Sequence, residues 1–132
     1  MKKTVSFQTK DGVKIIGDFF DARSKKSVIL LHILPGNRQD FDKFAELLWQ
    51  NSYNVLNIDE RGHGESEAWA GEMGSWQEFT QIDYDKMIYD VEAAAEWLKA
   101  RIPDTELAVI GGSIGANLSL LYGAKAQPKI VV

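Results

Sequence analysis

The residues best suited to chemistry lie near the end of the chain, where Gly111, Ser113 and Gly115 form the pattern G-x-S-x-G. An apolar run at 107–110 precedes them, and a helix-like sequence follows. This is the pattern of a nucleophile elbow, a tight strand-to-helix turn whose flanking glycines remove side chains that would clash there. The N–H groups at the start of the helix would face a developing oxyanion. Ser113 is therefore the candidate nucleophile, and the alternative is a glycine-rich turn whose serine only caps the helix.

The segments before Ser113 must position it, and they alternate between strand and helix patterns. Residues 4–9 and 13–20 flank Asp11-Gly12 and predict an antiparallel β-hairpin. The continuous apolar run 28–31 is typical of a strand buried on both faces of a parallel sheet. The other predicted elements are a helix capped by Asp40 and ending at Asn51-Ser52, a strand at 53–58, a helix at 82–102, a strand at 107–110, the helix after Ser113 and a strand at 129–132. This order predicts a three-layer α/β fold with helices on both faces of a parallel sheet.

Composition narrows the function classes. The chain has 132 residues and a net charge of −4 with the two signs interspersed, so it lacks the basic patch of a nucleic-acid-binding protein. It has no cysteine, and its acids and two histidines show no metal-ligand spacing. Residues 111–116 differ from the dinucleotide-binding pattern because Ser113 occupies the place of the second glycine. We therefore expect no metal and no cofactor. The absence of long apolar runs predicts a cytoplasmic protein without membrane contact.

Taken together, the segments resemble the α/β-hydrolase family. The resemblance is carried by the hairpin, the strand that ends at His32, the loop 59–66 (Asp-Glu-Arg-Gly-His-Gly-Glu-Ser) and the 111–115 elbow, in the family's order. It is closest to the branch of small serine esterases, lysophospholipases and dienelactone-hydrolase-like proteins. It runs from about Thr4 to Val132 and implies a single domain, 1–132, from which the C-terminal strands of the family fold are missing.

The resemblance implies a serine hydrolase that acts on carboxylic esters, with Ser113 as the nucleophile. It also implies that the backbone N–H of Ile114 supplies half of an oxyanion hole. The other half would come from the loop after residues 28–31, where Leu34 N–H is the first choice and Ile33 N–H the second. Pro35 has no N–H and cannot serve.

Other residues of these loops have less direct roles in this interpretation. His32 would brace its loop, and His63 would be structural or face solvent. Asp59 and Arg61 would brace the 59–66 loop through charge-assisted hydrogen bonds. Trp69 and Trp76 either line a substrate pocket or pack the start of the long helix, and the sequence favours neither.

A serine nucleophile needs a general base and an acid, and in this family both follow the serine. After Ser113 the sequence contains no Asp, Glu or His. We weigh three explanations: a fragment of a complete esterase, a half-domain completed by a partner chain, and a non-catalytic binding or scaffold protein of the same descent. A small-molecule ester is the expected partner in the first two. The apolar strand end Ile130–Val132 would also favour self-association or pairing with another chain.

Overall fold

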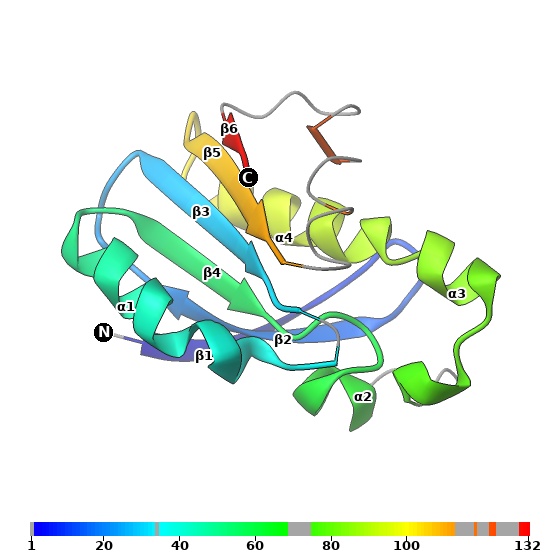
Figure 1. The fold of residues 1–132 in the computed structure, drawn as a ribbon. Helices are drawn as coiled ribbons and strands as arrows, with labels where there is room; N and C mark the ends of the chain where they lie inside the picture. The colour runs from blue at the N-terminus through cyan, green and yellow to red at the C-terminus, as the bar shows by residue number, and fades with distance from the viewer. Residues whose placement is uncertain (1, 34, 69–74, 113–117, 119–121, 124–129) are drawn as a thin grey trace.

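A computed structural model describes residues 2–33, 35–68, 75–112, 118, 122–123 and 130–132. The described strands form one six-stranded sheet in the order β1-β2-β4-β3-β5-β6 (Figure 1). They are β1 (Lys2–Gln8), β2 (Lys14–Phe20), β3 (Lys26–Leu31), β4 (Asn54–Ile58), β5 (Glu106–Gly111) and β6 (Ile130–Val131). β1 pairs with β2 and β2 with β4 in antiparallel orientation, whereas β4, β3, β5 and β6 run parallel. Both the predicted hairpin and the predicted parallel sheet are confirmed.

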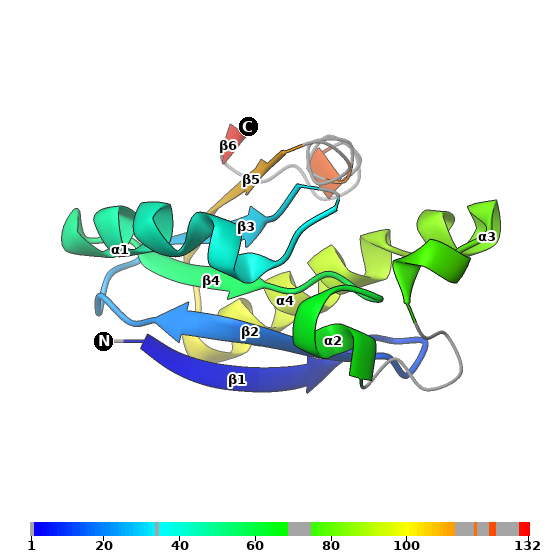
Figure 2. The same ribbon diagram turned by 60° about the horizontal axis from the view of Figure 1, so that its bottom comes forward.

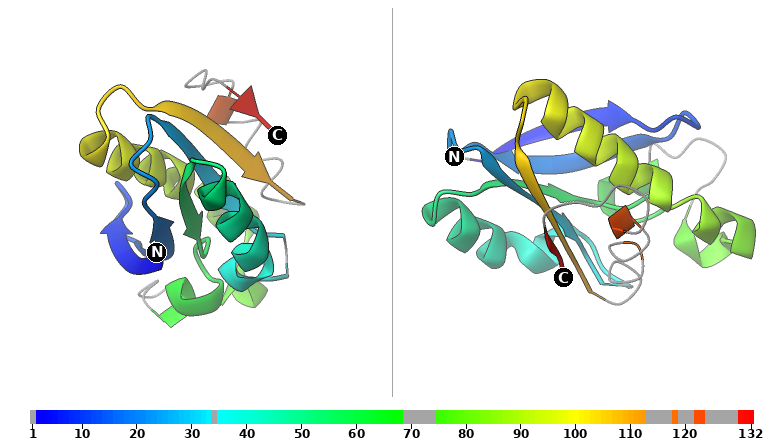
Figure 3. Two further views of the ribbon diagram at one scale, coloured as in Figure 1. Left: turned by 90° about the vertical axis from the view of Figure 1, so that its left-hand side faces the viewer. Right: turned by 90° about the horizontal axis from the view of Figure 1, so that it is seen from above.

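The described helices connect these strands in the predicted order, and the helix predicted after Ser113 lies mostly outside the described residues. The described helices are the 3₁₀ helix η1 (Arg38–Phe41), α1 (Asp42–Gln50), α2 (Gly64–Ala68), the 3₁₀ helix η3 (Trp76–Glu78), α3 (Gln81–Asp85) and α4 (Ile88–Arg101). α1 and α4 lie on opposite faces of the sheet, which gives three layers (Figure 3). The hairpin of β1 and β2 forms one margin of the sheet and β6 the other (Figure 2).

The core is divided by the sheet. Alternate residues of the central strands face α4 and its small residues Ala94 and Ala95, which allow close packing. The other set, which includes Val28, Leu30 and Val55, packs on the α1 face around Ala45. β3 is buried on both faces and is continuously apolar from Val28 to Leu31, as expected of a central parallel strand, whereas the equally buried β4 includes Asn54 and Asn57.

Two local predictions about helix boundaries are wrong. The single helix expected over 82–102 is two helices, α3 and α4, separated at Lys86–Met87 by a tighter turn in which Tyr89 N–H bonds to Lys86 O at 3.0 Å. Asp40 is not the helix cap. Asn37 caps η1 instead, and the Asp40 carboxylate accepts from the Asn37 N–H at 3.2 Å in a capping box.

Candidate functional site

The carboxyl ends of three parallel strands meet at one edge of the sheet. Leu31 of β3 lies opposite Ile58 of β4 and Gly111 of β5 in the strand register. The segments that follow these three strands therefore start side by side. They are the His32 loop, the 59–66 loop and the 111–115 turn, which are the three segments that the sequence marked as functional.

The elbow turn and the His32 loop approach each other closely. Gly112 N–H donates to Leu31 O at 3.2 Å, so the backbone pairing continues past the end of β5. A Cβ atom at Gly112 would lie 2.5 Å from Cγ2 of Ile33. Only glycine fits this position without displacing Ile33, so the second glycine of the Gly111-Gly112 pair has a steric cause that the sequence analysis did not identify.

Several predicted site residues lie outside the described residues: Ser113, Ile114, Gly115, Leu34 and Trp69. Their roles as nucleophile, oxyanion donors, elbow glycine and pocket residue stay predictions. Of the described site residues, Gly111 ends β5, and Ile33 is 46% exposed beside it.

His32 is fully buried, and its ring is held at both nitrogens. Nε2 accepts the backbone N–H of Glu60 at 3.0 Å, and Nδ1 lies 2.8 Å from the carbonyl oxygen of Ile33. Since Nε2 accepts, the proton resides on Nδ1, which donates to Ile33. Burial lowers the pKa of His32, so the ring is neutral. His32 braces its loop, as the resemblance implied, because both ring nitrogens form hydrogen bonds to the main chain of the His32 loop and the 59–66 loop.

His63 and Trp76 pack together above the same edge. The His63 ring lies 4.9 Å from that of His32, and the Trp76 ring is stacked on it at 5.8 Å with an interplanar angle of 5°. Nδ1 of His63 is 2.9 Å from the Arg61 carbonyl oxygen. His63 is buried, so the expectation of a solvent-facing side chain is wrong and the structural interpretation holds. Trp76 stacks on His63, and the choice between a pocket role and a packing role for Trp76 stays open.

Asp59 anchors the 59–66 loop to the segment that follows β3. Its carboxylate accepts the backbone N–H of Arg38 at 2.7 Å, the Arg38 guanidinium, and the backbone N–H of Glu65 at 3.0 Å. Arg38 is buried and also bonds to Asp18 of β2 at 2.9 Å. The loop turns back at Gly64, where φ is +50° and a Cβ would lie 2.5 Å from the Asp59 carboxylate. The brace predicted for Asp59 is present, and Arg38 and Asp18 are partners that the sequence did not reveal.

Arg61 anchors the other side of the loop. Its Nε donates a hydrogen bond to the Asp90 carboxylate of α4 at 2.7 Å. The two terminal nitrogens of the guanidinium donate to the Asp11 carboxylate at 2.7 and 2.8 Å, which makes a bidentate pair. This pair with Arg61 lowers the pKa of Asp11 to about 2. Burial raises the pKa of Asp90 to about 6, which still leaves this carboxyl ionised at neutral pH. The sequence analysis did not identify Asp90 as a partner of Arg61, because position 90 lies off the apolar face predicted for this helix.

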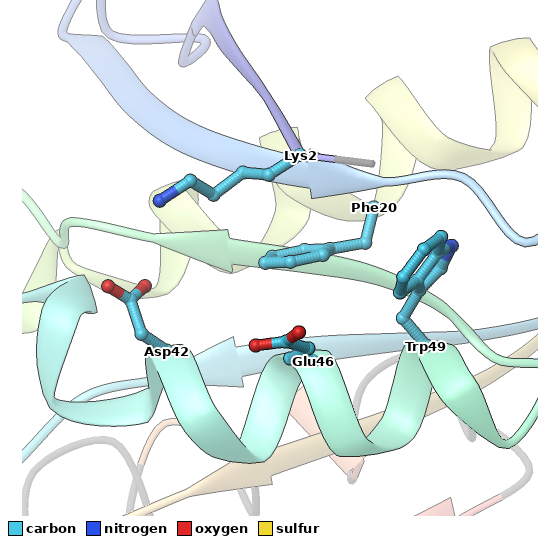
Figure 4. Close-up of a pocket in the computed structure, with 5 residues that line it drawn as sticks. All are labelled: Lys2, Phe20, Asp42, Glu46 and Trp49. Atoms are coloured by element: carbon cyan, nitrogen blue, oxygen red, sulfur yellow. The ribbon is translucent and has the colours of Figure 1, made fainter.

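A separate pocket of about 290 Å³ lies between α1 and the hairpin. Figure 4 shows Asp42, Glu46 and Trp49 on α1 facing Phe20 of β2 and Lys2 of β1. None of the predicted site residues that the structure describes lines it. In the part of the chain that the structure describes, no group of three or more His, Asp or Glu is placed to hold a metal ion. No helix among the described residues is long and apolar enough to span a membrane.

A parallel sheet with an antiparallel N-terminal hairpin, helices on both faces and a glycine turn after the third parallel strand defines the α/β-hydrolase class. The chain belongs to the family described as serine aminopeptidase, S33, whose model matches residues 22–132.

Comparisons with known proteins agree with this assignment. The structure is similar to an esterase of Pyrococcus furiosus, with a TM-score of 0.80 and 32% identity, over 97% of this chain and 49% of that one. The sequence is 30% identical to a non-heme chloroperoxidase of Streptomyces lividans over 91% of this chain and 39% of that protein. It is 26% identical to a serine hydrolase-like protein of Dictyostelium discoideum over 96% of this chain and 32% of that protein. The chain thus spans less than half of the length of each of these three relatives.

Proposed function

We propose that residues 1–132 are the first part of a single α/β-hydrolase domain that cleaves small carboxylic esters with Ser113 as nucleophile. One observation carries this proposal. The register of β3 and β5 brings Gly111 and Gly112 against Leu31 and Ile33, so the residue before Ser113 touches the loop proposed to supply an oxyanion donor. Nucleophile and oxyanion donors must converge on one carbonyl group, and this edge is where they would do so.

In the proposed reaction the Ser113 hydroxyl attacks the ester carbonyl and passes its proton to a histidine. The backbone N–H of Ile114 and that of Leu34, with Ile33 as the second choice, bind the oxyanion. We do not assign the base to His32, because both of its ring nitrogens already bond within the loops. We place the acid and the base in residues outside 1–132, supplied by a further segment of the protein or by a partner chain that pairs beyond β6. The cytoplasmic location stays a prediction.

The test is covalent labelling of the full-length protein with a fluorophosphonate probe, followed by hydrolysis of a p-nitrophenyl ester. Labelling requires an activated serine. We expect one adduct, which is lost in Ser113→Ala and kept in Ser6→Ala, an exposed serine on β1 that serves as the matched control. An adduct that survives Ser113→Ala refutes the assignment. A folded protein without any adduct would favour the alternative of a non-catalytic binding role, for which the lack of Asp, Glu and His after Ser113 is the argument.

A further inference from the structure

Glu60 has a side chain that the bracing of its loop does not use. It is fully buried, and neither of its carboxyl oxygens has a hydrogen-bond partner among the described residues. Its neighbours Asp59 and Arg61 both use their side chains to anchor the loop. A buried carboxyl group without partners is unfavourable for folding, so its presence needs a cause other than stability.

The geometry around His32 supplies that cause. The backbone N–H of Glu60 donates to Nε2 of His32 at 3.0 Å, and Oε2 of Glu60 lies 3.3 Å from Nδ1 on the other side of the ring. A single residue therefore contacts both nitrogens of the imidazole. The Nδ1–H in turn donates to the Ile33 carbonyl at 2.8 Å.

The Ile33 carbonyl belongs to the peptide group whose nitrogen is that of Leu34. A peptide group is planar, so whatever fixes the direction of its carbonyl also fixes the direction of its N–H. That N–H is the first-choice oxyanion donor of the loop. Glu60 is therefore connected to the Ile33 carbonyl group through the His32 ring and two hydrogen bonds.

The side chain of Glu60 is held in its uncharged form beside His32. Burial raises the pKa of its carboxyl well above the usual value, and the negative charges of Asp90 and Asp59 raise it further. The groups that face or adjoin it are His32 after β3, His63 and Asp59 in its own loop, and Asp90 on α4, with Asp59 and Asp90 paired to Arg38 and Arg61. An uncharged carboxyl places no negative charge beside a developing oxyanion, whereas an ionised one would repel it.

We infer that Glu60 is a positioning residue for the oxyanion loop: its main-chain N–H holds Nε2 of His32 and its carboxyl lies against Nδ1, so that His32 orients the Ile33 peptide group. This inference rests on the proposed function. We assign Glu60 no contact with substrate or with the reacting atoms.

The test compares Glu60→Gln and Glu60→Ala with wild type in the full-length protein, with Glu46→Gln on α1 as a control for the loss of a carboxyl. We expect Glu60→Ala to lower kcat by about tenfold with KM within about twofold, since a misplaced oxyanion donor affects the transition state. Glu60→Gln, which keeps the shape and an acceptor oxygen, should restore kcat. Wild-type kcat should also fall as the pH rises through the ionisation of Glu60, and Glu60→Gln should lack that alkaline decrease.

Three results would overturn the inference: unchanged kcat in Glu60→Ala, a Glu60→Gln variant as impaired as Glu60→Ala, or identical pH profiles for wild type and Glu60→Gln. The last comparison does not depend on whether Glu60→Ala folds. A second readout, the ¹⁵N chemical shifts of the His32 ring, separates this inference from the proposed function. Glu60→Gln should keep the wild-type Nδ1 shift, and Glu60→Ala, which removes only the oxygen 3.3 Å from Nδ1, should change it. If Ser113-dependent turnover is absent, the proposed function fails, and an unchanged Nδ1 shift in Glu60→Ala shows independently that the Glu60 side chain does not position the ring.

Discussion

Replacing Glu60 by glutamine should stabilise the protein, by an amount that grows with pH. In the unfolded chain the Glu60 carboxyl ionises around its ordinary pKa of 4.5, whereas burial in the folded protein keeps it protonated to higher pH. Between these two pKa values the folded state holds a proton that the unfolded state has released. The free energy of unfolding therefore falls as pH rises, by up to about 1.4 kcal/mol per pH unit, until the folded-state carboxyl ionises. Glutamine does not titrate, so the Glu60→Gln variant escapes this loss.

The measurement is urea denaturation of wild type, Glu60→Gln and the control Glu46→Gln at pH values from about 4.5 to 7.5. The difference in unfolding free energy between Glu60→Gln and wild type should be smallest at the acidic end and increase by about 1 kcal/mol or more over the first pH unit. Glu46→Gln should show no such increase, because Glu46 is exposed. A difference between Glu60→Gln and wild type that is independent of pH, or that decreases as pH rises, would show that the carboxyl of Glu60 is not held protonated in the folded protein.

Two further predictions concern the ion pairs that anchor the 59–66 loop. Arg38→Met leaves Asp18 and Asp59 buried without their cation and should lower the free energy of unfolding by about 3–5 kcal/mol; a loss below about 1 kcal/mol in urea denaturation would contradict this, because the pairs would then carry no net burial penalty. Asp11→Asn should destabilise the protein by about 1 kcal/mol at neutral pH after solvent screening of this partly exposed group. Because the pKa of Asp11 is lowered to about 2, that contribution should be lost as the pH falls from about 4 to about 2, and a destabilisation that persists in acid would refute the pairing with Arg61.

Much of the fold could be predicted because its signals are local. The turn at Asp11-Gly12 and the apolar run at 28–31 each carry their meaning within a few residues, and both were assigned correctly. The division at Lys86–Met87 could not be predicted, because the apolar period of 82–102 continues across it. In the structure the Asp90 carboxylate near the start of α4 accepts the backbone N–H of Arg61 at 2.8 Å, a contact that the sequence pattern does not reveal.

The sequence predicted the motifs of the candidate site, but it did not predict which residues form hydrogen bonds and ion pairs with them. The 59–66 loop was expected to be braced by Asp59 and Arg61, and it is. Their partners, however, come from positions 20 or more residues away along the chain, as with Arg38 and Asp59, or 50 residues away, as with Asp11 and Arg61. No spacing rule connects such positions. Glu60 was quoted only as part of a motif, since nothing in the sequence shows that its side chain is turned toward His32.

The three consecutive residues Asp59, Glu60 and Arg61 contact three different parts of the protein. Asp59 binds the segment after β3, and Arg61 binds α4 and the hairpin turn. With the loop anchored on both sides, the residue between them has little freedom to move its backbone N–H away from His32. The ion pairs therefore do more than stabilise the fold, because they determine where the Glu60 N–H and carboxyl lie. It follows that the anchoring charges of Asp59 and Arg61 act, through the Glu60 N–H and the His32 ring, on the position of the Ile33 carbonyl group.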